Sequence, residues 1–131
     1  FIQSSYKEGQ FPDMPHLCIR GTKGWELYVQ PDFQRARELV INKEAHNPFN
    51  GNNGLDEYLH RNKVSTLLIA GVTTDNCVSA TTYVSLGKGY RPVVAEDCGS
   101  TAGYKRATSH TQKLQESGGF FNTCSVNLSN L

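Results

Sequence analysis

The feature that most constrains the fold is a unit in the second half of the chain, where two apolar segments flank a helical pattern. Residues 64–71 (VSTLLIAG) are almost continuously apolar, which is typical of a strand buried on both faces of a parallel sheet. Residues 74–89 show helical spacing and end at Gly87 and Gly89. The expected buried stripe of this helix comprises Cys77, Ala80, Val84 and Gly87. Residues 90–98 (YRPVVAEDC) form the next strand, so the segment predicts a right-handed βαβ unit.

The remaining segments also alternate between strand and helix patterns. The first thirty residues are rich in proline and glycine and predict loop. Residues 38–43 (ELVINK) predict a short strand, and residues 55–63 predict a helix with Asn53 as the candidate cap. A last helix over residues 103–116 and a last strand over residues 122–126 complete the pattern. We therefore predict one α/β domain, residues 1–131, with a parallel sheet.

Composition excludes several classes of function. A net charge of +1 offers no broad basic face for nucleic acid, and no apolar run is long enough to cross a membrane. The four cysteines and four histidines form neither a CxxC pair nor a zinc pattern. We therefore expect reduced thiols, a cytoplasmic protein, and neither a metal nor a cofactor.

Reactive side chains follow the predicted strands, at the edge where open parallel sheets bind ligands. Cys77 falls in the first turn of a helix, where unpaired N–H groups and the helix dipole favour a thiolate. Lys43 ends one strand, and Glu96 and Asp97 end another. A thiolate, a cation and N–H donors together suit acyl transfer through a thioester.

Structural explanations compete with each of these assignments. Cysteine is often a small buried packing residue, and a lysine at a strand end is usually solvated. Glu96 and Asp97 fit loop caps, and Thr74 or Asp75 is expected near the helix N-cap. His46 follows Lys43 closely and is a candidate for lining a pocket.

Three segments, taken in order, resemble the isochorismatase-like cysteine hydrolases. They are PHLCIRGTKGWEL at residues 15–27, VINKEAHNPFNGNNGLDEYL at residues 40–59, and the stretch from LLIAGV to EDC at residues 67–98. That superfamily includes nicotinamidases, N-carbamoylsarcosine amidases, ureidoacrylate amidohydrolases and isochorismatases. The match extends over nearly the whole chain.

The resemblance implies a role for each site residue. Cys77 is expected to be the nucleophile, and Lys43 the cation that stabilises its thiolate. A cis peptide is expected between Val72 and Thr73, and the N–H groups of Thr73 and Cys77 are expected to form the oxyanion hole. The residues expected to contact the substrate are Phe49, Val72 and His46.

The resemblance also implies a three-layer α/β/α fold with strand order 3-2-1-4-5-6. Residues 1–11 resemble the loop after the second strand, so the chain is expected to lack the first two strands. It would then be the C-terminal two-thirds of a longer protein. The family's catalytic aspartate and the nicotinamidase metal motif would lie upstream of Phe1, and Asp75 suits capping better than catalysis.

The function implied is hydrolysis of a small carboxamide or ureido C–N bond by a homo-oligomer, a dimer or tetramer. Three alternatives stay open. They are vinyl ether hydrolysis of the isochorismatase type, a catalytically silent protein that binds a small acid or serves as an oligomeric scaffold, and a peroxide-sensing thiol.

Overall fold

A computed structural model of the chain describes residues 1–13, 17–32, 34, 39–101, 112, 116 and 120–122. The chain divides into two compact units, Phe1–Glu57 and Tyr58–Leu131, which are described separately. The helix expected over residues 103–116, apart from Gln112 and Glu116, lies outside the described residues. The final strand expected over residues 122–126 is described only at Asn122. The single domain predicted for residues 1–131 stays a prediction.

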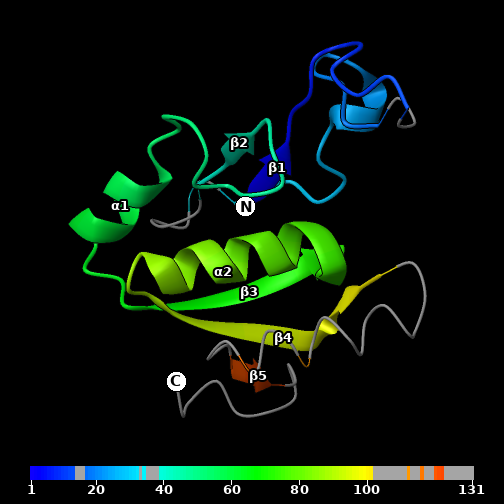
Figure 1. Ribbon diagram of the computed structural model, residues 1–131. Helices are drawn as coiled ribbons and strands as arrows, with labels where there is room; N and C mark the ends of the chain where they lie inside the picture. Colours follow the sequence, from blue (N-terminus) through cyan, green and yellow to red (C-terminus); the bar gives the residue numbers. More distant parts are fainter. Residues whose placement is uncertain are drawn as a thin grey trace. The chain divides into compact units, whose positions relative to one another are not determined.

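In the first unit, strand β1 (Ile2–Ser4) pairs in parallel with strand β2 (Ile41–Lys43), as Figure 1 shows. Strand β2 confirms the strand predicted before Lys43. The prediction of loop throughout the first thirty residues is wrong at β1. This strand forms through pairing with a segment almost forty residues away, so its local sequence carries little signal. It occupies the place beside β2 that the expected strand order gives to the second strand.

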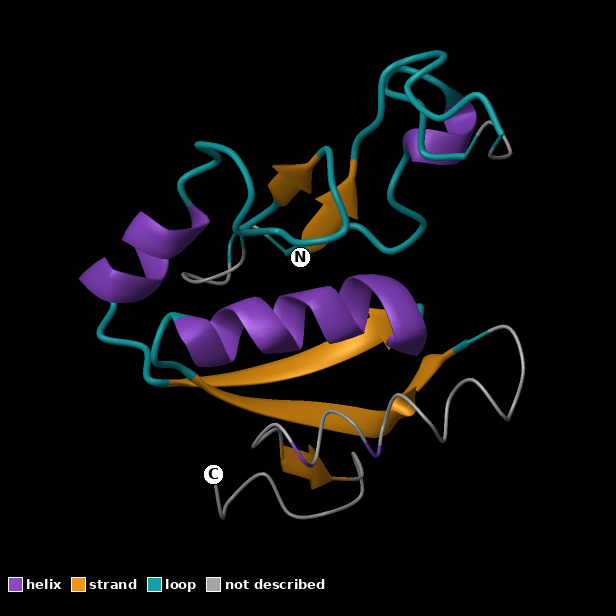
Figure 2. Cartoon of the chain, in the orientation of Figure 1, coloured by secondary structure: helices purple, strands orange, loops and turns teal. Residues whose placement is uncertain are grey.

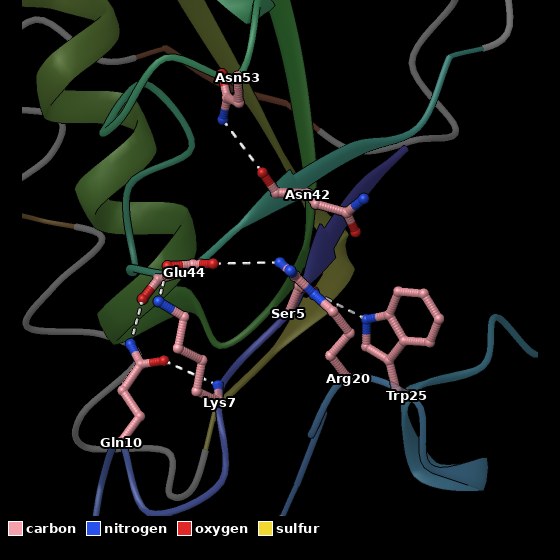
Figure 3. A network of polar contacts seen from close by, with 8 residues as sticks. All are labelled: Ser5, Lys7, Gln10, Arg20, Trp25, Asn42, Glu44 and Asn53. Atoms are coloured by element: carbon pink, nitrogen blue, oxygen red, sulfur yellow. Dashed lines mark hydrogen bonds and ion pairs between the residues drawn. The ribbon is translucent and has the colours of Figure 1, made fainter.

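Within the first unit, a polar network around Ser5 and Glu44 holds the loop that follows β1 (Figure 3). The Ser5 side chain is buried, and its hydroxyl accepts hydrogen bonds from Arg20 Nε at 3.0 Å and Trp25 Nε1 at 3.1 Å. The Glu44 carboxylate pairs with Arg20 at 3.2 Å and with Lys7 at 3.8 Å. The network therefore ties the short 3₁₀ turn η1 (Lys23–Trp25) and its neighbours to β1 and to the end of β2.

Helix α1 (Leu55–Arg61) begins as the sequence predicted. The Asn53 side-chain oxygen accepts a hydrogen bond from the Leu55 N–H at 3.2 Å, which satisfies one of the first-turn donors. Leu55 and Leu59, one helical turn apart, are both buried. The capping role predicted for Asn53 is confirmed.

In the second unit, three strands form a parallel sheet in the order β3-β4-β5. They are β3 (Thr66–Val72), β4 (Arg91–Ser100) and β5 (Phe120–Asn122). Helix α2 (Ser79–Gly87) connects β3 to β4 and packs against the sheet (Figure 2). The residues buried in β4 are Pro92, Val93, Val94 and Ala95. This arrangement confirms the predicted βαβ unit and the parallel α/β class.

Two burial predictions are wrong in this unit. Leu68, in the strand predicted to be buried on both faces, is 49% exposed, because exposure alternates along β3 and one of its faces is not covered by the described residues. Helix α2 does not bury the predicted stripe. A π-helical turn, η2 (Thr74–Val78), precedes α2, and its wider winding rotates the following helix relative to Cys77. The residues buried there are Val78, Ser79, Thr82 and Ser85.

The cysteines differ from one another in state. Cys18 and Cys77 are thiols, whereas Cys98 is disulfide-bonded. The expectation of reduced thiols is therefore wrong at Cys98. None of the helices described is both long and apolar enough for a membrane span.

Candidate active site: the Cys77 turn and the end of β2

Cys77 lies in η2, at the corner where β3 passes into α2, and its side chain is half-buried. The residue that precedes the turn, Thr73, is extended, with φ −98° and ψ 148°. Its carbonyl accepts hydrogen bonds from the N–H groups of Asn76 at 3.1 Å and Val78 at 3.2 Å. The peptide between Val72 and Thr73 is cis, as the resemblance implied. The predicted position of Cys77 at a strand-to-helix corner is confirmed.

Residues at the end of β4 hold this turn from the other side. The Thr74 hydroxyl donates to the Ser100 carbonyl at 3.4 Å, and the Thr101 hydroxyl donates to the Asp75 carboxylate. The N-cap residue is Thr73, one position before Thr74 and two before Asp75, and it makes no side-chain cap bond. Sequence reasoning did not identify Thr101, whose contact joins residues that lie 26 positions apart.

Glu96 and Asp97 do not end their strand. Between the pairs Ile69↔Val94 and Gly71↔Gly99, β3 has one residue where β4 has four, so the register shifts at this point. Glu96 and Asp97 lie in that irregular stretch, are exposed, and are followed by three more strand residues. The strand continues because the pairing resumes beyond the shift, and it carries Ser100 to the Cys77 turn.

In the first unit, Lys43 is the last residue of β2 and is only 5% exposed. Its Nζ donates to the Ala45 carbonyl at 2.9 Å and lies 6.0 Å from the centroid of the Tyr6 ring. The Tyr6 ring in turn packs edge-on against Phe11, with 5.1 Å between the centroids. The interpretation of Lys43 as a solvated lysine is wrong. Tyr6, which supplies its aromatic neighbour, was not identified from the sequence.

The remaining candidates divide between the two units. His46 and Phe49 are half-buried in the turn after Lys43, and the Phe49 N–H donates to the Asn47 side chain at 2.9 Å. Val72 ends β3 in the second unit, beside Thr73. The first unit thus carries Lys43, His46 and Phe49, and the second carries Val72, Thr73 and Cys77. Over the described part of the chain, no three histidine, cysteine or acidic side chains are grouped to hold a metal ion.

Comparison with known families agrees with these features. The model of the Isochorismatase domain matches residues 3–124, which is nearly the entire chain. The chain belongs to the isochorismatase family. The candidate residues of both units therefore lie on segments that the family model covers.

Individual relatives agree with this assignment. The isochorismatase family protein YrdC of Bacillus subtilis is 34% identical over 85 residues, or 59% of this chain and 45% of its own. N-carbamoylsarcosine amidase of an Arthrobacter species is 35% identical over 60 residues, or 46% of this chain and 22% of its own. The crystal structure of pyrazinamidase/nicotinamidase from Streptococcus mutans superposes with a TM-score of 0.85 at 25% identity, covering 93% of this chain and 74% of that one. The matched part spans less than half the length of both curated relatives.

Proposed function

We propose that this isochorismatase domain belongs to a hydrolase that cleaves a small carboxamide or ureido C–N bond through a thioester on Cys77. The observation that carries the proposal is the position of a cysteine thiol in the first turn after β3. The amidase and nicotinamidase among the relatives support amide chemistry. Helix N-termini favour a thiolate, which is the nucleophilic form of cysteine.

The reaction would proceed in two steps. A general base takes the thiol proton while the sulfur of Cys77 attacks the substrate carbonyl, and the tetrahedral oxyanion accepts hydrogen bonds from the Thr73 and Cys77 N–H groups. The C–N bond then breaks, and the protonated base returns its proton to the leaving amine. Water attacks the thioester with help from the same base, releasing the acid and restoring the thiol.

Lys43 would supply the positive charge that stabilises the Cys77 thiolate. Its pairing with Cys77 rests on the order of the family motifs, and its burial suits a fixed cation better than a solvated one. We also propose that the general base is an aspartate upstream of Phe1, in a longer protein of which this chain is the C-terminal part. His46, Phe49 and Val72 would contact the substrate.

The proposal also includes a homo-oligomeric enzyme in the cytoplasm. Light scattering on the purified full-length protein measures the first property directly. The disulfide at Cys98 argues against the second property, because disulfides are rare in the reducing cytoplasm.

The direct test is turnover of a panel of small amides and ureido acids by the full-length protein and by Cys77→Ser. We expect at least one amide to be hydrolysed by the wild type, with release of its amine, and none at a comparable rate by the variant. Hydrolysis of isochorismate with no turnover of any amide would favour the vinyl ether alternative. Full amide turnover by Cys77→Ser would refute covalent catalysis.

A further inference from the structure

The turn that carries Cys77 is attached to the end of β4 by two neighbouring side-chain contacts. The Thr74 hydroxyl donates to the Ser100 carbonyl at 3.4 Å. One residue further along each segment, the Thr101 hydroxyl donates to the Asp75 carboxylate. Both contacts connect segments 26 residues apart, so they fix the turn against a strand rather than against its own helix.

The backbone beneath these contacts is closely packed. Gly71 of β3 is the register partner of Gly99 in β4. A Cβ atom added at Gly99 would lie 3.1 Å from the Gly71 carbonyl oxygen and 3.3 Å from Thr74 Oγ1. The end of β4 therefore lies so close to the turn that a side chain at Gly99 would force its neighbours to move, and Thr101, two residues further on, contacts Asp75.

The contact between Thr101 and Asp75 is stronger than an ordinary surface hydrogen bond. Its acceptor is a carboxylate, and hydrogen bonds to ionised acceptors are about twice as strong as neutral ones. Both side chains are half-buried, which limits competition from water. Asp75 precedes Cys77 by two residues in the same turn, so restraining its side chain restrains the backbone that carries the sulfur.

We propose that Asp75 and Thr101 form a positioning pair for Cys77, in which the bond between them fixes the nucleophile turn in its attacking geometry. Neither residue is proposed to touch the substrate or to exchange a proton. The inference rests on the proposed function, in which Cys77 attacks a carbonyl. It assigns Asp75 a task distinct from that of the general base, which the proposed function assigns to a different aspartate.

The test compares Thr101→Val with Thr101→Ser in the full-length enzyme. Valine matches the shape of threonine but cannot donate, whereas serine keeps the hydroxyl. We expect Thr101→Val to lower kcat by about ten- to a hundredfold, the range expected when a reacting group is misplaced by a fraction of an ångström to about 1 Å. The KM should change less than about twofold, because substrate contacts are untouched, and Thr101→Ser should keep most of the wild-type kcat.

A matched control removes a threonine hydroxyl elsewhere. Thr22 Oγ1 donates to the Ile19 carbonyl at 2.7 Å in an exposed turn of the first unit, so Thr22→Val should leave kcat unchanged. The inference is overturned if Thr101→Val keeps the wild-type kcat, with or without a lower melting temperature. It is also overturned if Thr101→Ser loses as much activity as Thr101→Val.

Should Thr101→Val fail to fold, Asp75→Asn decides the question. The amide keeps the shape and an acceptor oxygen but removes the charge, so kcat should fall by a smaller factor, about threefold or more. An unchanged kcat in a folded Asp75→Asn protein would overturn the inference.

Alkylation of Cys77 by iodoacetamide, followed by peptide mapping, separates this inference from the proposed function. If the wild type hydrolyses no amide, the proposed function fails and the alkylation rate alone tests positioning. The inference then requires a changed rate in Thr101→Val and a wild-type rate in Thr101→Ser. Equal rates in all three proteins would overturn it.

Discussion

The hydroxyl of Ser5 offers a quantitative test of how the Lys43 end of β2 is held. Ser5 is fully buried, its N–H donates to the Lys43 carbonyl at 2.8 Å, and its hydroxyl accepts from Trp25 and Arg20 (Figure 3). Replacing Ser5 with alanine keeps the backbone pairing and removes only the shared acceptor. Two donors on the following loop then lose their partner.

The magnitude follows from the two bonds. The Trp25 N–H is a half-buried neutral donor, and losing its acceptor costs about 1 kcal/mol. The Arg20 side chain is 54% exposed and still pairs with Glu44. Losing its hydrogen bond to Ser5 therefore also costs about 1 kcal/mol, less than the loss of an acceptor would cost a buried charged donor. We therefore expect Ser5→Ala to lower the free energy of unfolding by about 2 kcal/mol. With a urea dependence of about 2 kcal/mol per M, the midpoint should fall by about 1 M.

The assay is urea denaturation of the full-length protein, followed by Trp25 fluorescence and by far-ultraviolet circular dichroism. Ser65→Ala is the control, because Ser65 is exposed and its removal should change stability by less than about 0.5 kcal/mol. A loss for Ser5→Ala no larger than that of the control would show that both donors find water or other acceptors at no cost, and that the Ser5 hydroxyl does not stabilise this loop.

Two further predictions concern the glycine contact and the buried lysine. Gly99→Ala should destabilise the protein by about 1–3 kcal/mol, because its Cβ would meet the Gly71 carbonyl oxygen and Thr74. Gly87→Ala, with no atom within 4 Å of the added Cβ at the end of α2, should be neutral or stabilising by up to about 1 kcal/mol in thermal melts. Equal effects at the two positions would contradict the close approach of β4. Lys43→Met should lower kcat/KM about a hundredfold through loss of a positioned charge, and Lys43→Arg should not restore it, because the buried site holds a compact ammonium. Wild-type steady-state kinetics in Lys43→Met would remove Lys43 from the mechanism.

Local patterns were sufficient for the elements that form from local sequence. The helical spacing after Asn53 and its capping side chain predicted α1, and the apolar runs on either side of Cys77 predicted β3 and β4. The strand-to-helix corner then placed Cys77 correctly. Each of these features is determined by residues that lie close together in the sequence, in the same helical turn or the same strand.

Long-range contacts account for what the sequence did not predict. Strand β1 exists because it pairs with β2, and Lys43 is buried beside Tyr6, which lies on a distant loop. The bond from Thr101 to Asp75 follows the pairing of Gly99 and Ser100 with β3, which resumes beyond the register shift at Glu96 and Asp97. Spacing along the chain contains no signal for any of these contacts.

Covalent catalysis requires an acyl intermediate on Cys77. Such an intermediate is detected by the mass of the full-length enzyme, quenched in acid during turnover of a slowly hydrolysed amide and then digested for peptide mapping. We expect a mass increase equal to the acyl group on the peptide that contains Cys77, and no such adduct or turnover in Cys77→Ser. An enzyme that turns over the amide without any adduct on Cys77, and keeps its rate in Cys77→Ser, does not use Cys77 as a nucleophile.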